Sequence, residues 1–349
     1  TSIRGGISRY IINLSKELHK INIQNHIVAP IHINKMLKEY AMNSSNIYGT
    51  YINQKPLYTN KILNLSNYFF TKLYLNKINP KIYHQTYYGK FPKLKKITRV
   101  ITVHDLIHEK FHSYYGMPSN YRPKKHSLEK ADKIICVSNS TKEDLIDFYN
   151  IDEKKIRVIS HGHEHIFKLT NNDNIINKNE ILYVGGRGKY KNFKNLIKAF
   201  VLNKKINNCF KLVCFGGGSF NKNEINFFKE NKIYEKIRHQ DGDDKILANL
   251  YKTSACMIYP SLYEGFGLPI IESMAIGCPV IASNIKPIIE TAGDAATYFD
   301  PKETDDLSQK LEKLLYQSDK TEIVNKGYQR VQKFKWKDCS LKTLSFYNE

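Results

Sequence analysis

The sequence lacks C-x-x-C pairs, and it lacks any apolar run near the ~18 residues that a membrane-spanning helix needs. Most of the six cysteines lie in apolar runs such as KIICVS and KLVCF; they are Cys136, Cys209, Cys214, Cys256, Cys278 and Cys339. Such scattered thiols favour buried free cysteines over disulfides and indicate a reducing compartment. We therefore expect a cytoplasmic protein, either free in the cytoplasm or bound at the inner face of the membrane.

Acidic residues are scarce in the first half of the chain. Residues 1–150 carry 23 basic and 9 acidic residues, a net charge of +14 out of +21, and no acid lies between Glu39 and Asp105. This balance suits nucleic acid, an anionic membrane or a phosphorylated substrate, whereas a solvated lysine-rich surface is the plainer explanation. No RNA-binding or helix-turn-helix signature is present, so we expect no nucleic-acid partner.

One basic segment also carries aromatic residues. Residues 61–78, KILNLSNYFFTKLYLNKI, mix Lys with Phe, Tyr and Leu. As a helix the segment could lie on an anionic membrane surface. Packing against the sheet of its own domain is the alternative, and both stay open.

Short apolar strands alternate with amphipathic helices in both halves of the 349 residues. HIVA, KIYHQ, RVITV and KIICVS represent the first series, and EILYVGG, FKLVCFG, ACMIYPS and CPVIAS represent the second. Continuous apolar strands are typical of parallel sheets that are buried on both faces. The pattern predicts two doubly wound α/β domains, with a junction in the polar stretch 168–180.

The stretch 263–272, YEGFGLPIIE, connects a predicted strand to a predicted helix. Gly265 and Gly267 allow a ligand close to the backbone, and the N–H groups at the helix start favour an anion. Glu272, one turn into the helix, can accept hydrogen bonds from vicinal hydroxyls, and Glu264 can meet a second polyol. A ligand with hydroxyls on both sides of a phosphate, such as a nucleotide sugar, suits this order of binding groups. A strand–turn–helix with two surface glutamates and no ligand is the alternative.

EGFGLPIIE resembles the E-x7-E motif of family 4 retaining glycosyltransferases, and residues 247–301 resemble the donor domain of that family nearly throughout. The resemblance implies the GT-B fold, in which a cleft separates two Rossmann-like, doubly wound parallel-sheet domains. It implies a catalytic role for Glu264. It also implies that the donor is bound by Gly265, Phe266, Gly267, Leu268 and Glu272.

Residues 183–200, YVGGRGKYKNFKNLIKAF, resemble the family segment that supplies an Arg and a Lys to the pyrophosphate of the donor. The resemblance assigns these catalytic roles to Arg187 and Lys191. A guanidinium and an ammonium can neutralise a leaving diphosphate without a metal. The interval between them is shorter than in some members, so Lys189 or Lys194 could take the place of Lys191.

Three glycines and a histidine follow from the same resemblance. RGGISRYIINL (4–14) resembles the glycine loop of the first domain, which places Gly5 and Gly6 at the donor phosphates and acceptor. Gly216 in CFGGGS would line the nucleotide site. TVHDLIHEKF (102–111) resembles the V-H-D segment of the family, and its His104 is expected near the transferred sugar.

The resemblance also sets the expected domain limits. We expect an acceptor-side domain over 1–168, a donor domain over 169–333, and a terminal helix over 334–349 that returns to the first domain. The family begins with a strand before its glycine loop, whereas this sequence begins at the loop. We therefore expect that ~10–15 residues, one strand and its lead-in, are missing from the given sequence.

The implied reaction is retaining, metal-independent transfer of a hexose from a nucleoside-diphosphate sugar to the hydroxyl of a glycan or a lipid-linked acceptor. No cofactor is expected. TVHDLIHEKF is similar to segments of GDP-mannose-using mannosyltransferases of bacterial polysaccharide assembly, so GDP-mannose is the first donor to consider, with a UDP-sugar as the alternative. A nucleotide-sugar epimerase and a basic nucleic-acid-binding protein are the rival functions.

Two motifs suggest a metal. HGHEHIF (161–167) sets His161, His163 and His165 at alternate positions, which could bind zinc from one face of a strand. DGDD (241–244) has the spacing used by metal-dependent glycosyltransferases of another fold. It directly precedes a predicted helix, however, where aspartates serve as caps. We favour no metal at either motif.

Overall fold

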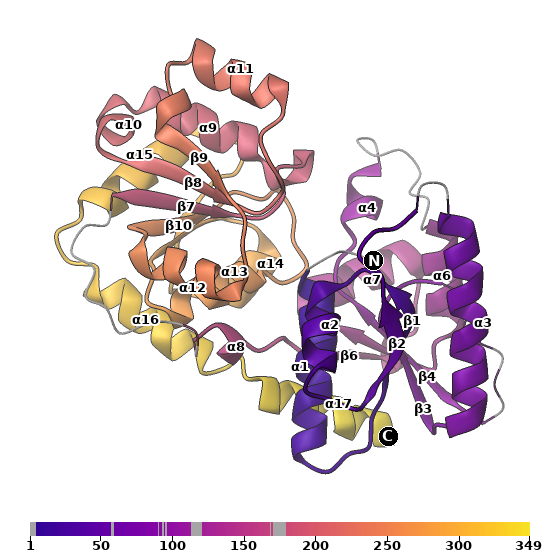
Figure 1. Ribbon diagram of the computed structural model, residues 1–349. Coiled ribbons are helices and arrows are strands. Elements are labelled where there is room, and N and C mark those ends of the chain that lie inside the picture. The colour runs from indigo at the N-terminus through magenta and orange to yellow at the C-terminus, as the bar shows by residue number, and fades with distance from the viewer. Residues whose placement is uncertain are drawn as a thin grey trace. The chain divides into compact units, whose positions relative to one another are not determined.

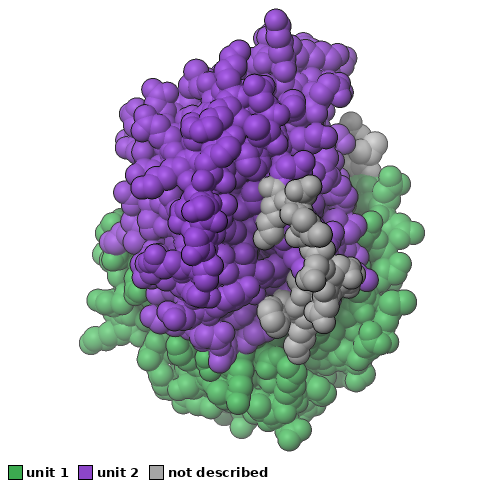
Figure 2. Space-filling view, turned by 90° about the vertical axis from the view of Figure 1, so that its left-hand side faces the viewer, with its two compact units in different colours: residues 1–161, 336–349 green, residues 162–335 purple. Residues whose placement is uncertain are grey.

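The computed structural model describes residues 5–56, 59–89, 91, 92, 94, 96–112, 121–167, 169 and 179–349. It divides into two compact units, residues 1–161 with 336–349 as unit 1 and residues 162–335 as unit 2 (Figure 2). The chain changes units at 161/162 and 335/336, whereas the limits expected from the sequence are 168/169 and 333/334. Each unit is an α/β domain with parallel strands, which confirms the predicted fold class.

Unit 2 is built on a six-stranded parallel sheet in the order β12-β11-β10-β7-β8-β9. The strands are β7 (Glu180–Val184), β8 (Lys211–Phe215), β9 (Ile237–Gln240), β10 (Cys256–Tyr259), β11 (Val280–Ser283) and β12 (Thr297–Phe299). The longer helices are α9 (Phe193–Leu202), α10 (Lys204–Cys209), α11 (Lys222–Glu230), α12 (Asp244–Thr253), α13 (Leu268–Ala275), α14 (Lys286–Ala292), α15 (Thr304–Tyr316) and α16 (Thr321–Val331). The short ones are α8 (Glu164–Phe167), η2 (Lys189–Lys191) and η3 (Tyr234–Lys236).

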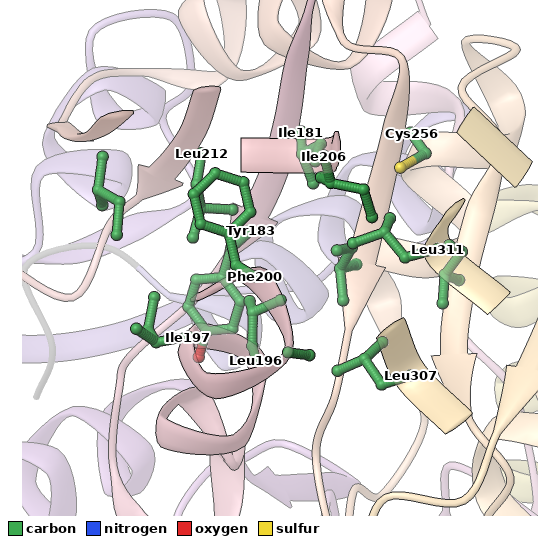
Figure 3. Packing of buried hydrophobic residues seen from close by; sticks show 14 of the residues in the cluster. Ile181, Tyr183, Leu196, Ile197, Phe200, Ile206, Leu212, Cys256, Leu307 and Leu311 are labelled. Carbon is green, nitrogen blue, oxygen red and sulfur yellow. The ribbon is translucent and has the colours of Figure 1, made fainter. Parts of the chain in front are cut away.

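Helices cover both faces of this sheet, with α9 and α10 on one face and α12 and α13 on the other (Figure 1). Figure 3 shows the side chains that join α9 to the sheet: Tyr183 from β7 faces Leu196, Ile197 and Phe200. All four are at most 1% exposed. Burial on both faces explains why the strands are continuously apolar in sequence.

Unit 1 contains a four-stranded parallel sheet in the order β3-β4-β5-β6 and a parallel pair, β1-β2. The strands are β1 (Ile27–His32), β2 (Ile47–Tyr51), β3 (Ile82–Gln85), β4 (Thr98–Val103), β5 (Lys133–Cys136) and β6 (Ile156–Val158). The helices are α1 (Gly6–Lys20), α2 (Lys35–Ala41), α3 (Asn60–Ile78), α4 (Ile107–Lys110), α6 (Tyr121–Lys130), α7 (Asn139–Tyr149), η1 (Glu153–Lys155) and α17 (Trp336–Asn348).

The last helix packs against the first helix within unit 1. Trp336 and Phe346 of α17 share a buried cluster with Tyr10 and Leu14 of α1. In the described part of the chain β1 and β3 each pair on one side only. Residues of both strands line one cavity of about 850 Å³, so two strand edges border this space.

The cysteines are free thiols, of which Cys209 is exposed and the other five are buried. Among the described helices, none combines the length and the hydropathy that crossing a membrane requires.

Candidate active site

Three loops of unit 2 meet at the carboxyl edge of its sheet. β10 pairs with β7, and β7 pairs with β8, in parallel. Their carboxyl ends therefore lie at the same edge. The strand order reverses between β7 and β10: β8 and β9 are added on one side of β7, and β10, β11 and β12 on the other. Open α/β sheets bind ligands at such a reversal.

The loop after β10 leads directly into α13. Gly267 caps the helix with a φ of 95°, a conformation that favours glycine, and an added Cβ would lie 3.1 Å from Cδ1 of Ile270. Pro269 lies in the first helical turn, where its missing N–H costs little. Glu264, at the start of the loop, is only 7% exposed. The loop thus holds a buried carboxylate beside a helix N-terminus.

Lys191 lies against this carboxylate. Its Nζ donates a hydrogen bond of 2.6 Å to Oε1 of Glu264, and both side chains are largely buried. The backbone links the same loops, since the Leu262 amide donates to the Tyr190 carbonyl at 2.7 Å. The alternatives, Lys189 and Lys194, have exposed side chains. The lysine that the resemblance assigned and the first glutamate of the motif therefore form one ion pair.

Glu272 is 1% exposed and is held by two side chains. Nε2 of His165, on α8, donates to its Oε1 at 2.9 Å, and the Tyr251 hydroxyl, on α12, donates to its Oε2 at 3.1 Å. A carboxylate can accept about four hydrogen bonds, and both oxygens of Glu272 accept from protein donors. Neither partner of Glu272 was predicted from the sequence. His165 was considered only as a zinc ligand, and no local signal marks Tyr251.

The guanidinium of Arg187 is engaged within unit 2. Nε donates to Glu224 of α11 at 2.7 Å, and the terminal nitrogens donate to the carbonyls of Gly216 at 3.3 Å and of Gly218 and Ser219 at 2.9 Å each. The side chain is 7% exposed. Arg187 therefore fixes the glycine loop after β8, and Glu224 was not foreseen from the sequence.

The remaining donor-domain candidates lie along the same loops. Gly216 has a φ of 77°, and an added Cβ would meet no atom within 4 Å. Gly265 is buried, and Leu268 opens α13 and is half-buried. Phe266 packs edge-on against Phe334 at 5.5 Å. The phenyl ring therefore anchors the loop to the protein.

The three alternating histidines have different partners. His161 belongs to unit 1, where its ring stacks on His104 at 5.6 Å. In unit 2, Nδ1 of His163 lies 2.8 Å from the Phe334 carbonyl oxygen, and His165 binds Glu272. Across the described ranges no group of three or more His, Cys, Asp or Glu could hold a metal ion. In DGDD, Asp243 caps α12 by accepting from the amides of Lys245 and Ile246.

His104 lies in unit 1 within a cluster of aromatic rings. Tyr10 contacts it edge-on at 5.2 Å. Its Nε2 is buried and has no hydrogen-bond partner among the described residues. Burial lowers the pKa of His104 from 6.5 to about 4, with a smaller contribution from the Lys124 ammonium. The imidazole is therefore neutral at physiological pH and can bind a hydroxyl through Nε2.

A second ring nearby is also neutral. Burial, with His104 as the second cause, lowers the pKa of His84 to about 3. Its two nitrogens lie 2.7 Å from Oγ1 of Thr102 and 2.6 Å from the hydroxyl of Tyr347. These contacts connect β3 and β4 to α17.

A buried ion pair supports the segment after His104. Nζ of Lys124 lies 3.0 Å from the carboxylate of Glu109 and also donates to the Asp105 carbonyl at 3.0 Å. Tyr149 donates to the same carboxylate at 2.6 Å. Both charged side chains are 2% exposed. The pair fixes α6 to α4 and was not predicted.

The glycine loop of unit 1 is Gly5–Gly6, at the start of α1. Gly5 caps the helix in an extended conformation, and the Arg9 amide donates to its carbonyl at 3.1 Å. A Cβ added at Gly6 would meet no atom within 4 Å. The backbone of Gly6 is therefore uncovered on the side that a side chain would occupy.

Comparisons with known proteins find similar chains among curated mannosyltransferases. "O-antigen chain mannosyltransferase B" of Escherichia coli is 26% identical over 234 residues, which cover 63% of this chain and 61% of the relative. "O-antigen chain mannosyltransferase RfbU" of Salmonella typhimurium is 30% identical over 233 residues, 62% and 60% of the two chains. The chain thus spans about three fifths of the length of these curated relatives.

Two solved structures share the fold. The crystal structure of a glycosyltransferase from Rickettsia africae has a TM-score of 0.74 and 23% identity, with 100% of this chain and 96% of that chain covered. The structure of Anabaena Alr3699/HepE in complex with UDP and glucose has a TM-score of 0.75 and 15% identity, with 100% and 98% covered. The GT-B prediction is confirmed.

Two family models divide the chain between them. The model described as "Glycosyltransferase Family 4" matches residues 4–165, and the model described as "Glycosyl transferases group 1" matches residues 168–330. Together they cover most of both units, including the E-x7-E motif. The protein therefore belongs to the family 4 glycosyltransferases, as the sequence resemblance predicted.

Proposed function

We propose that the protein transfers a hexose from a nucleoside-diphosphate sugar to the hydroxyl of a glycan or lipid-linked acceptor, with retention of the anomeric configuration and without a metal. The observation that carries this proposal is the Lys191–Glu264 pair beside the start of α13, at the edge where the sheet order reverses. A lysine, a helix N-terminus and hydroxyl-binding carboxylates match the parts of such a donor.

Mannose is the first sugar to test. Two relatives are named O-antigen chain mannosyltransferases, and the HepE structure contains UDP and glucose. We therefore propose GDP-mannose as the donor, with a UDP-sugar as the alternative and no further cofactor. This choice rests on relatives whose length the chain covers only in part.

In the proposed reaction the bond between the sugar and the diphosphate breaks while the acceptor oxygen bonds to the same anomeric carbon. The Lys191 ammonium and the N–H groups of Gly267 and Leu268 stabilise the negative charge that develops on the leaving diphosphate. That diphosphate also takes the proton of the acceptor hydroxyl. Retention then needs no nucleophile from the protein.

The glutamates and His104 position the donor. Glu264 accepts hydrogen bonds from sugar hydroxyls, and its ion pair with Lys191 reduces the repulsion between its carboxylate and the phosphates. Glu272 accepts hydrogen bonds from the ribose hydroxyls. Gly265 and Phe266 shape the sugar pocket, and Gly216 lines the nucleotide pocket. These residues exclude water and orient the reacting atoms.

In unit 1 we propose that His104 contacts the transferred sugar and that Gly5 and Gly6 leave room for phosphates and acceptor. Because His104 is neutral, its bare Nε2 can bind a sugar hydroxyl without attracting the diphosphate. Arg187 is the exception among the assigned residues. Its bonds within unit 2 favour a role in fixing the loop after β8.

The test is a thermal-shift panel of nucleotide sugars, followed by product analysis with acceptor glycans in buffer that contains EDTA. We expect a selective shift with one donor, since a ligand of the native state raises its stability. We also expect a glycosidic bond of retained configuration. Free isomerised sugar nucleotide would identify an epimerase instead. DNA binding without any nucleotide-sugar affinity would refute the enzyme assignment.

A further inference from the structure

Helix α3, Asn60–Ile78, is fixed to unit 1 through one face. The side chain of Asn67 brackets the backbone of Ile31 in β1: the Ile31 amide donates to its Oδ1 at 2.8 Å, and its Nδ2 donates to the Ile31 carbonyl at 3.1 Å. Tyr74 stacks on Tyr48 of β2 at 3.9 Å, and Leu75 is 3% exposed. The inner face of α3 is thus defined by specific contacts.

The opposite face of α3 is also apolar, yet it is exposed. Ile62, Leu65, Phe69 and Leu73 are exposed by 66%, 71%, 55% and 48%. Their intervals of three, four and four residues place them on one stripe of a helix. Phe70, 40% exposed, borders the stripe. Figure 1 shows α3 along one margin of unit 1.

Single exposed apolar residues are normal on a protein surface, but this clustering is not. Of the fifteen large hydrophobic residues that are exposed in the described ranges, five lie on this one helix. A surface helix normally carries polar residues on its outer face. The outer stripe of α3, Ile62–Leu65–Phe69–Leu73, therefore has the character of a contact surface.

Charge indicates what the stripe contacts. At about 3.6 residues per turn, Lys72 and Lys77 fall on opposite sides of it. Residues 40–104 contain ten Lys and Arg and no acid, so nothing in this sequence segment repels an anionic surface. An apolar stripe with flanking lysines is the pattern of helices that lie in the headgroup region of anionic bilayers.

We propose that the outer stripe of α3 docks unit 1 on an anionic lipid bilayer. The stripe enters the boundary between headgroups and acyl chains, and Lys72 and Lys77 contact lipid phosphates. The structure shows the packing of α3 on its own domain through one face, and the contact of the other face with lipid is the proposal. The proposal does not rest on the transfer reaction, because lipid binding is measured without donor or acceptor.

The test is co-sedimentation of the full chain with vesicles of equal parts phosphatidylcholine and phosphatidylglycerol. We expect binding to these vesicles and little to pure phosphatidylcholine. The double variant L65S/F69S should lower the partition coefficient at least about tenfold, because two apolar side chains no longer enter the bilayer. The matched control L202S/I289S removes two exposed apolar residues of unit 2 and should bind as the unsubstituted protein does.

The charges are tested by K72Q/K77Q. This variant should bind the anionic vesicles about tenfold less and lose part of its salt dependence. Equal binding by L65S/F69S and the control would overturn the proposal. So would a monomer–dimer equilibrium in light scattering that L65S/F69S abolishes in the absence of vesicle binding, because the occupant would then be a second copy. Failure of vesicle binding with intact sugar transfer would leave the proposed function standing.

Discussion

The ammonium of Lys191 and the carboxylate of Glu264 lie 2.6 Å apart, although 73 residues of sequence separate them. The two side chains come from the loops that follow the adjacent strands β7 and β10. Because both are largely buried, each limits the charge that the other presents to a ligand. The ion pair also holds the Lys191 ammonium in position before a diphosphate binds, so little reorganisation is needed when it does.

We predict that K191M and E264Q each lower kcat for sugar transfer by about a hundredfold or more, since a preorganised charge is lost from the site. K191M removes the cation that faces the diphosphate, and E264Q weakens both the sugar contacts and the hold on Lys191. The measurement is steady-state kinetics with circular dichroism as a check of the fold. K189M, at an exposed lysine two residues away, is the control and should retain activity. Loss in K189M with retention in K191M would reverse the assignment.

The hydrogen bonds to Glu272 predict a second effect. H165A should raise the Kd for the nucleotide donor about tenfold with a smaller change in kcat, because Glu272 then loses the group that orients its carboxylate. Y251F should act in the same direction. Isothermal titration with the donor and its nucleoside diphosphate measures the effect.

A neighbouring histidine gives the matched control for H165A. His163 contacts the carbonyl of Phe334 rather than Glu272, so H163Q is expected to affect stability but not donor affinity. If H163Q and H165A weaken donor binding equally, the effect belongs to the segment as a whole and not to Glu272.

Arg187 and Glu224 should behave as a pair. If Arg187 acts by fixing the loop after β8, then E224Q weakens donor binding in the same direction as R187K, by about tenfold, and both lower the melting temperature. If Arg187 contacts the diphosphate directly, only R187K weakens binding while E224Q binds normally. A donor titration of both variants and of the double variant separates these outcomes, and the double variant should add little to either single one.

The parallel α/β architecture was predictable because it depends on local patterns. Continuously apolar strands, helical periodicity and glycine at strand ends are visible within ten or fifteen residues. The loop from β10 to α13 was predictable for the same reason, since Gly267 and Pro269 suit a strand-to-helix turn. The resemblance then assigned Lys191 and Glu264, which the structure joins.

The partners of these residues were not predictable from the sequence, because they are distant along it. Glu272 meets His165 across 107 positions, and Arg187 meets Glu224 across 37. In the sequence, the alternating His161, His163 and His165 resemble a metal-binding motif. In the structure their side chains reach separate partners, since α8 begins at Glu164 and ends the extended geometry that a shared face would need. The buried pair of Lys124 and Glu109 likewise has no local signature.

The neutral imidazoles of unit 1 predict sensitivity to acid. The pKa of His104 is about 4 and that of His84 about 3, both below the 6.5 of an unfolded chain. As the pH falls below 6.5, the unfolded state takes up these protons before the native state does. The stability that is fully present above 6.5 is therefore lost toward about pH 4 and 3, by up to about 1.4 kcal/mol per pH unit for each histidine.

We predict that H104F reduces this slope, because one of the two groups that must remain unprotonated is then absent. Urea unfolding followed by the fluorescence of Trp336, the single tryptophan, reports on unit 1 directly, since that ring lies in the same cluster as Tyr10. Between about pH 6 and 4 the stability of H104F should fall less steeply, by about 1 kcal/mol per pH unit, than that of the unsubstituted protein. Above neutral pH the two slopes should coincide. Parallel curves through the acid range would show that the pKa of His104 is not lowered in the native state, and the effect of burial on this imidazole would then be wrong.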